Sequence, residues 1–154
     1  MDNKAIFYVQ SIHSFWQDTE KEIISAKEQN CKILLQFDAN AKIGNEFLAL
    51  DPNKMSNNGK IMLDILKRQN LFILNIDKNC KGVITRQRVT VKGVEISVLD
   101  YTIVCENLKM MFDHMMIDED RTHVLTKYTK KRGLSIKTES DHNITFAKFN
   151  IQYR

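Results

Sequence analysis

The 154-residue sequence predicts a single-domain α/β protein in which helices and strands alternate first and strands predominate later. In residues 5–76, short continuous apolar runs, typical of strands, alternate with apolar positions at helical spacing. In residues 83–104, β-rich segments flank Lys92-Gly93, which is a candidate hairpin turn. Because we find no internal repeat and no linker, residues 1–154 are expected to form one domain.

In the first half of the chain, two amphipathic stretches separate the apolar runs. Ser14 and Gln17 resemble a capping box at the start of the first stretch, and Asn70 ends the second. The short run at 33–35 is typical of a strand buried on both faces. The expected elements are a strand at 5–9, a helix at 14–29, a strand at 33–38, a loop at 41–58, a helix at 59–70 and a strand at 71–76.

The second half of the chain is richer in strand patterns. Residues 83–91 and 94–104 are predicted strands on either side of the turn, and a further strand is expected within the methionine-rich segment 110–117. Residues 144–149 alternate as a half-exposed final strand does, whereas the basic and poorly periodic residues 121–137 are expected to be partly loop.

The composition, with 43% hydrophobic and 27% charged residues, is that of a soluble globular protein. The chain shows no secretory signal peptide and no apolar run near the ~18 residues of a membrane span, so we expect an intracellular protein with no membrane partner. The net charge of +4 is compatible with a polyanionic partner, although a solvated mixed-charge surface is the commoner cause. The widely spaced Cys31, Cys80 and Cys105 argue against a zinc knuckle and a disulfide framework.

Asp38 ends the strand that begins with the apolar run 33–35, and Asn40 lies two residues beyond it. Alternate residues beyond a strand end can point into one cleft, where a carboxylate could orient water and a carboxamide could donate to a phosphate oxygen. Asp and Asn are also common wherever strands turn, so simple Asx-turn chemistry is the alternative.

Asp100 lies inside the apolar run 98–104, where a buried carboxylate is costly unless it is paired. His142 could be its partner, since a carboxylate fixes an imidazole tautomer; the alternative places Asp100 on the solvent face of an edge strand. Asp141 adds a carboxylate suited to Mg²⁺, which binds few carboxylates together with substrate oxygens. The other histidines are expected on the polar surface, and they are His13, His114 and His123.

The three clusters resemble motifs of the endonuclease/exonuclease/phosphatase superfamily, which read GDFN, SxxDY and SDH. The resemblance covers nearly the whole chain. The sequence around Asn40 and His142 is most similar to that of the endonuclease domains of non-LTR retrotransposons. It implies a DNase I-like four-layer α/β sandwich with mixed, mainly antiparallel sheets, flanking helices and a site at one rim. The residues that carry it are Phe37-Asp38-Ala39-Asn40, Ser97-Val98-Leu99-Asp100-Tyr101 and Ser140-Asp141-His142, together with Phe15-Trp16, Asn58-Gly59 and Thr85-Arg86.

The resemblance implies a role for each of these polar residues. Asp38 matches the aspartate that orients or activates the attacking water, and Asn40 matches the asparagine that contacts the scissile phosphate. Asp100 matches the aspartate paired with the site histidine, His142, and Asp141 matches a metal-associated carboxylate. The implied cofactor is Mg²⁺, with Mn²⁺ as the alternative, and the implied reaction is hydrolysis of a DNA phosphodiester, as in target nicking by a retroelement.

Basic residues near the predicted hairpin are candidate contacts to the DNA backbone, namely Arg86, Arg88 and Lys92. A solvated hairpin surface is the commoner explanation for each of them taken individually. The retrotransposon resemblance further implies a nuclear location and a reverse transcriptase in a longer polyprotein.

The sequence departs from the family pattern in two respects. Phe37 stands where the first motif has glycine and Ala39 where it has phenylalanine, so the local backbone is expected to differ. The family's N-terminal metal-binding glutamate has no counterpart, since the early glutamates are expected on the surface of a helix; they are Glu20, Glu22 and Glu28. We therefore expect residues 1–154 to be the C-terminal half of the sandwich.

This expectation leaves alternative functions open. The first is a metal-dependent phosphodiesterase acting on DNA, with a complementing N-terminal half as a partner. The second is a catalytically inactive remnant or a nucleic-acid- or protein-binding module, whose uncovered apolar sheet face would favour self-association. A phosphomonoesterase acting on inositol phosphates or lipids would use the same site, but the motif sequences favour DNA as the substrate.

Overall fold

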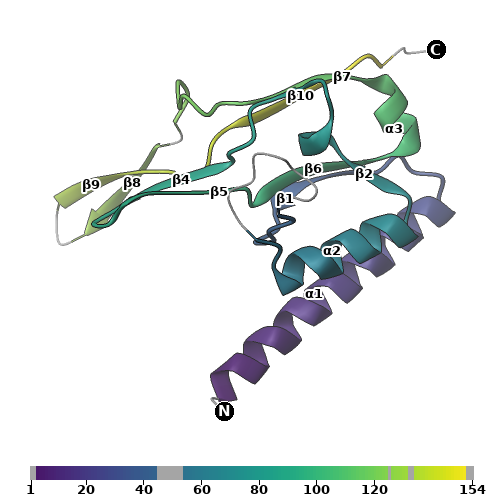
Figure 1. Ribbon diagram of the computed structural model, residues 1–154, viewed down its shortest axis with the longest axis horizontal. Coiled ribbons are helices and arrows are strands. Elements are labelled where there is room, and N and C mark those ends of the chain that lie inside the picture. The colour runs from purple at the N-terminus through teal and green to yellow at the C-terminus, as the bar shows by residue number, and fades with distance from the viewer. Residues whose placement is uncertain (1–2, 45–53, 125, 132–133, 152–154) are drawn as a thin grey trace.

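The computed structural model describes residues 3–44, 54–124, 126–131 and 134–151 (Figure 1). Its elements in chain order are α1 (Asn3–Glu28), β1 (Leu34–Asp38), α2 (Asn57–Arg68), β2 (Leu71–Ile73), the 3₁₀ turn η1 (Leu74–Ile76), β3 (Cys80–Lys81), β4 (Arg86–Thr90), β5 (Gly93–Ser97), β6 (Asp100–Cys105), α3 (Glu106–Met111), β7 (Phe112–Ile117), β8 (Thr126–Lys131), β9 (Leu134–Glu139) and β10 (Thr145–Phe149). The mixed α/β class predicted from the sequence is confirmed.

The strands form two small sheets and two hairpins. One sheet has the order β1-β6-β2 and is antiparallel throughout; the other has the order β10-β7-β3, in which β10 pairs antiparallel and β3 parallel to β7. The β4–β5 hairpin turns between Thr90 and Gly93, as the sequence predicts, and Gly93 has a φ of +124° that a residue with a side chain rarely adopts. The β8–β9 pair is the second hairpin.

Two cores lie on opposite faces of β6, because successive side chains of a strand point to opposite sides. Tyr101 and Ile103 face α1 and α2, where Trp16 and Met62 are buried against them. Val104 belongs to the second core, which includes Met115 of β7. Figure 1 accordingly shows three layers: the two long helices, the sheet that contains β6, and the sheet that contains β7.

The loop that follows β1 leads into helix α2, so the N-terminus of this helix helps to fix the position of Asn40. The Ser56 hydroxyl caps the helix by accepting a hydrogen bond from the Gly59 backbone N–H at 3.0 Å. Gly59 packs so closely on the loop that a methyl group there would overlap the carbonyl oxygen of Lys42. The buried face is apolar, as predicted, and comprises Met62, Ile65 and Leu66.

Two predictions for the first half of the chain are wrong. Residues 5–9 belong to α1 and not to a strand, because a short apolar run is compatible with either element and the helix extends over 3–28. β1 is not buried on both faces: it lies at the edge of its sheet, and the side chain of Leu34 is 49% exposed. The helices cover only one face of this strand. Part of the predicted loop 41–58, residues 45–53, lies outside the described residues.

Other boundaries shift for local reasons. The strand predicted at 71–76 ends at Ile73, after which the chain forms η1. Met110 and Met111 belong to α3, and the strand predicted around them is β7. Residues 126–131 and 134–139 pair as β8 and β9 where a partial loop was expected, because hydrogen bonding between the strands does not require a periodic apolar pattern.

The sheet that contains β7 has an outer face that the described residues do not cover. Phe146 on β10 lies directly opposite Met116 on β7, and their side chains are 47% and 45% exposed. Within the described part of the chain, no helix combines the length and the apolarity that crossing a membrane requires.

Candidate functional site

The polar residues at the strand ends converge at one rim of the β1-β6-β2 sheet. Asp38, the last residue of β1, is the register partner of Asp100, the first residue of β6. His142 reaches both: its Nδ1 atom lies 2.9 Å from Asp100 Oδ2, and its Nε2 atom lies 3.8 Å from Asp38 Oδ2. Residues separated by more than a hundred positions in the sequence thus form one cluster.

Both oxygens of the Asp100 carboxylate contact His142 Nδ1, since Oδ1 also lies 3.1 Å from it. This contact favours the imidazole tautomer that carries its hydrogen on Nδ1, which leaves Nε2 directed toward Asp38. Asp100 is partly buried and lies on β6, the central strand of the β1-β6-β2 sheet, so the predicted pairing with His142 is observed and the edge-strand alternative is wrong.

The loop after β1 is held by an Asx turn and by α2. Asp38 Oδ1 accepts a hydrogen bond from the Asn40 backbone N–H at 2.8 Å, and Asn40 has a left-handed φ of +43°. The Asn58 amide donates to the carbonyl oxygens of Ala39 and Asn40 at 2.8 and 2.9 Å, and the Trp16 indole N–H donates to Asn58 Oδ1. The turn positions Asp38 while its other oxygen, Oδ2, faces His142.

Asp141 and Arg86, for which the sequence suggested separate roles, form an ion pair. The guanidinium of Arg86 contacts Asp141 Oδ2 through Nε at 2.8 Å and through its terminal nitrogen at 2.7 Å. Burial of the carboxyl opposes ionisation, but the hydrogen bond and charge of Arg86 outweigh it and lower the pKa of Asp141. The other oxygen, Oδ1, lies 3.8 Å from His142 Nε2.

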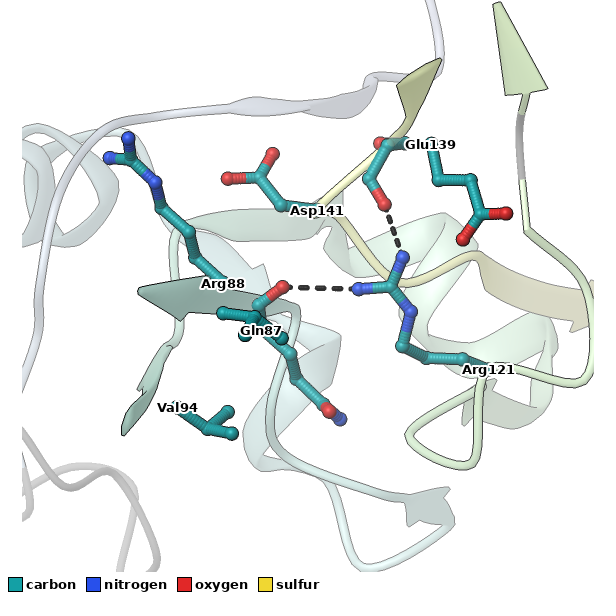
Figure 2. Close-up of a pocket in the computed structure, with 8 residues that line it drawn as sticks. Gln87, Arg88, Val94, Arg121, Glu139 and Asp141 are labelled. Carbon is teal, nitrogen blue, oxygen red and sulfur yellow. Dashed lines mark hydrogen bonds between the residues drawn. The ribbon is translucent and has the colours of Figure 1, made fainter. Parts of the chain in front are cut away.

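The remaining basic candidates lie on the β4–β5 hairpin beside this cluster. Arg88 lines a pocket of about 560 Å³ that also includes Arg121 and Asp141 (Figure 2). Lys92 is exposed in the turn of the hairpin. Arg88 therefore lies near Asp141 and Lys92 lies at the exposed end of the hairpin, whereas Arg86 is engaged with Asp141.

Arg121 is a site residue for which the sequence analysis found no signal. Its guanidinium donates to the carbonyl oxygens of Gln87, at 3.0 Å, and of Ser140 (Figure 2), so it ties β4 to the segment that carries Asp141. Its left-handed φ of +53° is held by Asp118, whose carboxylate accepts hydrogen bonds from the backbone N–H groups of Thr122 and His123.

Replacement of Asp118 by asparagine should reduce the acid dependence of stability. Hydrogen bonds from the His123 backbone N–H and from Thr122 lower the pKa of Asp118. Burial of the carboxyl opposes this shift but does not cancel it. The ionised carboxylate therefore stabilises the fold above the unfolded carboxyl pKa of about 3.9, and this contribution disappears as pH falls through the lower folded value. Thermal melts from about pH 6 to 2 should show a flatter acid limb in Asp118→Asn.

Asp120→Asn controls for the loss of one negative charge in the same loop, since Asp120 is exposed. An acid limb of Asp118→Asn as steep as that of the wild-type chain would contradict the assignment.

The donor set at the rim suits a divalent cation. Asp38, Asp100 and His142 each offer a ligand atom, and these atoms lie within 4.8 Å of one another. Two carboxylates and an imidazole suit Mn²⁺, and carboxylates suit Mg²⁺, which takes its other ligands from water and substrate. Asp141 lies outside this group: its Oδ2 is paired with Arg86, and its Oδ1 lies 3.8 Å from His142 Nε2.

The fold has a counterpart among solved structures. No protein-family model and no curated protein matches the sequence. The endonuclease domain of TRAS1, a telomere-specific non-LTR retrotransposon, is similar in structure, with a TM-score of 0.63 at 19% sequence identity. The similarity covers 89% of this chain and 52% of that one, so the chain spans about half the length of the matched domain. The chain therefore shares the fold of about half of this endonuclease domain, in agreement with the motif resemblance.

Proposed function

We propose that the chain is part of a metal-dependent phosphodiesterase that acts on DNA. The observation that carries this proposal is the convergence of Asp38, Asp100 and His142, with Asp141 beside them, at one rim of the sheet. The similarity to a retrotransposon endonuclease domain supports the same substrate class and a role in target nicking.

Each side chain has a role that its contacts support. Asp100 holds the His142 ring through its Nδ1–H, and a ring that is protonated on both nitrogens would donate through Nε2–H to a phosphate oxygen as its charge grows. Asp38, across from Nε2, would orient the attacking water and accept its proton, and Asn40 would donate to the phosphate. Asp38 and Asp141 would hold the cation, and the chemistry that a bound Mg²⁺ or Mn²⁺ supplies is neutralisation of phosphate charge and stabilisation of the leaving oxygen.

A non-catalytic binding module is the second candidate, and a specific observation favours it. The chain spans about half of the matched endonuclease domain, and the exposed pair Met116 and Phe146 leaves an apolar sheet face uncovered. A complementing half-domain, or a second copy, would bury such a face. In this case the chain would bind nucleic acid without cleaving it.

Nicking of supercoiled plasmid separates the two candidates. The first predicts nicking in Mg²⁺ or Mn²⁺ that EDTA abolishes and that Asp38→Asn reduces, because asparagine cannot accept the proton of water. Asp64→Asn is the matched control, since Asp64 is exposed on α2. Absence of metal-dependent nicking by the wild-type chain, with retained DNA binding, would identify the binding module.

Arg88→Ala and Lys92→Ala should each weaken DNA binding and lower its salt dependence. Neutralised phosphates release counterions, so the removal of one contact reduces the slope of log K against log salt by about 1. Fluorescence anisotropy with a labelled duplex over a KCl series measures this slope. Lys67→Ala, in the last turn of α2, is the control and should leave the slope unchanged. Slopes equal to wild type for both hairpin variants would place the DNA elsewhere.

A further inference from the structure

Thr85 lies between β3 and β4, where its side chain has no exposure to solvent. Its hydroxyl oxygen accepts hydrogen bonds from the backbone N–H groups of Leu99, at 2.9 Å, and Asp100, at 3.0 Å. A buried hydroxyl that receives two successive amides at the start of β6 constrains the backbone of Asp100 directly.

The sheet itself does not hold the Asp100 amide. Asp38 and Asp100 are register partners, but the backbone hydrogen bond next to this pair runs from the Ala39 N–H to the Leu99 carbonyl oxygen, at 2.8 Å. On the other side, β2 pairs with β6 only as far as Ile73, opposite Ile103. Beyond that point, the Asn75 amide donates to the Asp100 carbonyl oxygen at 3.0 Å, so side chains replace the missing strand.

The backbone of Thr85 reaches the segment that carries His142. Its N–H donates to the Ser97 carbonyl oxygen at 3.2 Å, and its carbonyl oxygen accepts a hydrogen bond from the Asn143 N–H at 2.7 Å. One residue therefore connects the chain on both sides of the Asp100–His142 contact: its hydroxyl holds Asp100, and its carbonyl holds the residue after His142.

From this geometry we propose that Thr85 is a positioning residue, whose hydroxyl fixes Asp100 so that the Asp100 carboxylate sets the tautomer and orientation of His142. The proposal rests on the proposed function for its catalytic consequence. The contacts themselves do not depend on it, so the two can be tested separately.

Thr85→Val removes the acceptor and keeps the shape of the side chain, whereas Thr85→Ser keeps the acceptor. Thr102→Val is a matched control on β6: Thr102 is buried, and its hydroxyl has no hydrogen-bond partner among the described residues. We expect Thr85→Val, but neither Thr85→Ser nor Thr102→Val, to alter the Asp100–His142 contact.

The first readout is the ¹⁵N NMR spectrum of the His142 ring in metal-free protein, at a pH well above the usual range for histidine. The wild-type ring should be mainly in the Nδ1–H form, and Thr85→Val should show a mixture of both tautomers. Amide exchange of Leu99 and Asp100 should be slow in the wild type and accelerate at least tenfold in Thr85→Val. None of these measurements requires nuclease activity.

The second readout is plasmid nicking. A displaced Asp100 should lower kcat by about 10²-fold with little change in KM, since small misplacements at a reacting centre have effects of this size. Loss of the NMR and exchange signatures without any wild-type nicking would support the role of Thr85 and refute the proposed function. Wild-type tautomer and exchange in a folded Thr85→Val would overturn the role of Thr85.

If Thr85→Val does not fold, the wild-type chain and Thr85→Ser decide the question. Slow exchange at both amides and a mainly Nδ1–H ring in these two proteins support the proposal. Fast exchange of Leu99 and Asp100 in the wild type, or loss of the Nδ1–H form in Thr85→Ser, would overturn it.

Discussion

Replacement of His142 by alanine should lower metal-dependent nicking of supercoiled plasmid by about 10²–10⁴-fold, the range typical of a positioned acid–base group. His142 is the residue on which the cluster depends, since its two ring nitrogens face Asp100 and Asp38 from opposite sides. Alanine removes both contacts and leaves two carboxylates without the imidazole between them. The rate of conversion of supercoiled to open-circle plasmid measures the effect.

His114→Ala is the matched control for this experiment. His114 lies on β7 with 57% of its side chain exposed, and its neighbour is Asp113. The control should nick at the wild-type rate and show the wild-type melting curve. Equal activity of His142→Ala and His114→Ala would rule out a catalytic role for the cluster, whatever the metal dependence of the wild-type chain.

Replacement of Trp16 by alanine should lower the free energy of unfolding by about 3–5 kcal/mol, as removal of a buried aromatic side chain commonly does. Trp16 is 1% exposed, and its ring lies 5.4 Å from that of Phe15 and 5.8 Å from that of Phe37. The same substitution removes the indole N–H that holds Asn58, and with it a constraint on the loop of Asn40. Urea unfolding followed by circular dichroism measures the loss.

Phe15→Ala provides the comparison for Trp16→Ala. Phe15 is adjacent in sequence and aromatic but 51% exposed, so its loss should cost only about 0.5–1.5 kcal/mol, the contribution of an aromatic pair. Similar losses in the two variants would mean that the ring of Trp16 is not the anchor between α1 and the sheet. Nicking by Trp16→Ala below its unfolding transition should also fall, because the loop of Asn40 loses the support of Asn58.

Local patterns were sufficient where the deciding interactions are local. The apolar face of α2 follows from the helical spacing of its apolar residues, and Asn70 ends this segment with a left-handed φ of +45°. The β4–β5 hairpin follows from Lys92-Gly93. The same kind of pattern misassigned residues 5–9, because an apolar run of that length suits a helix as well as a strand.

The amino-acid sequence by itself determined which functional groups are available: carboxylates, a carboxamide and an imidazole near three strand ends. Only the tertiary structure decided how they are paired. It joins Arg86 to Asp141, directs the two nitrogens of His142 to Asp100 and Asp38, and recruits Thr85 and Arg121 to hold the segments together. The physical reason is that these contacts link residues 14 to 104 positions apart, and their geometry depends on sheet register and burial, which no short stretch of sequence encodes.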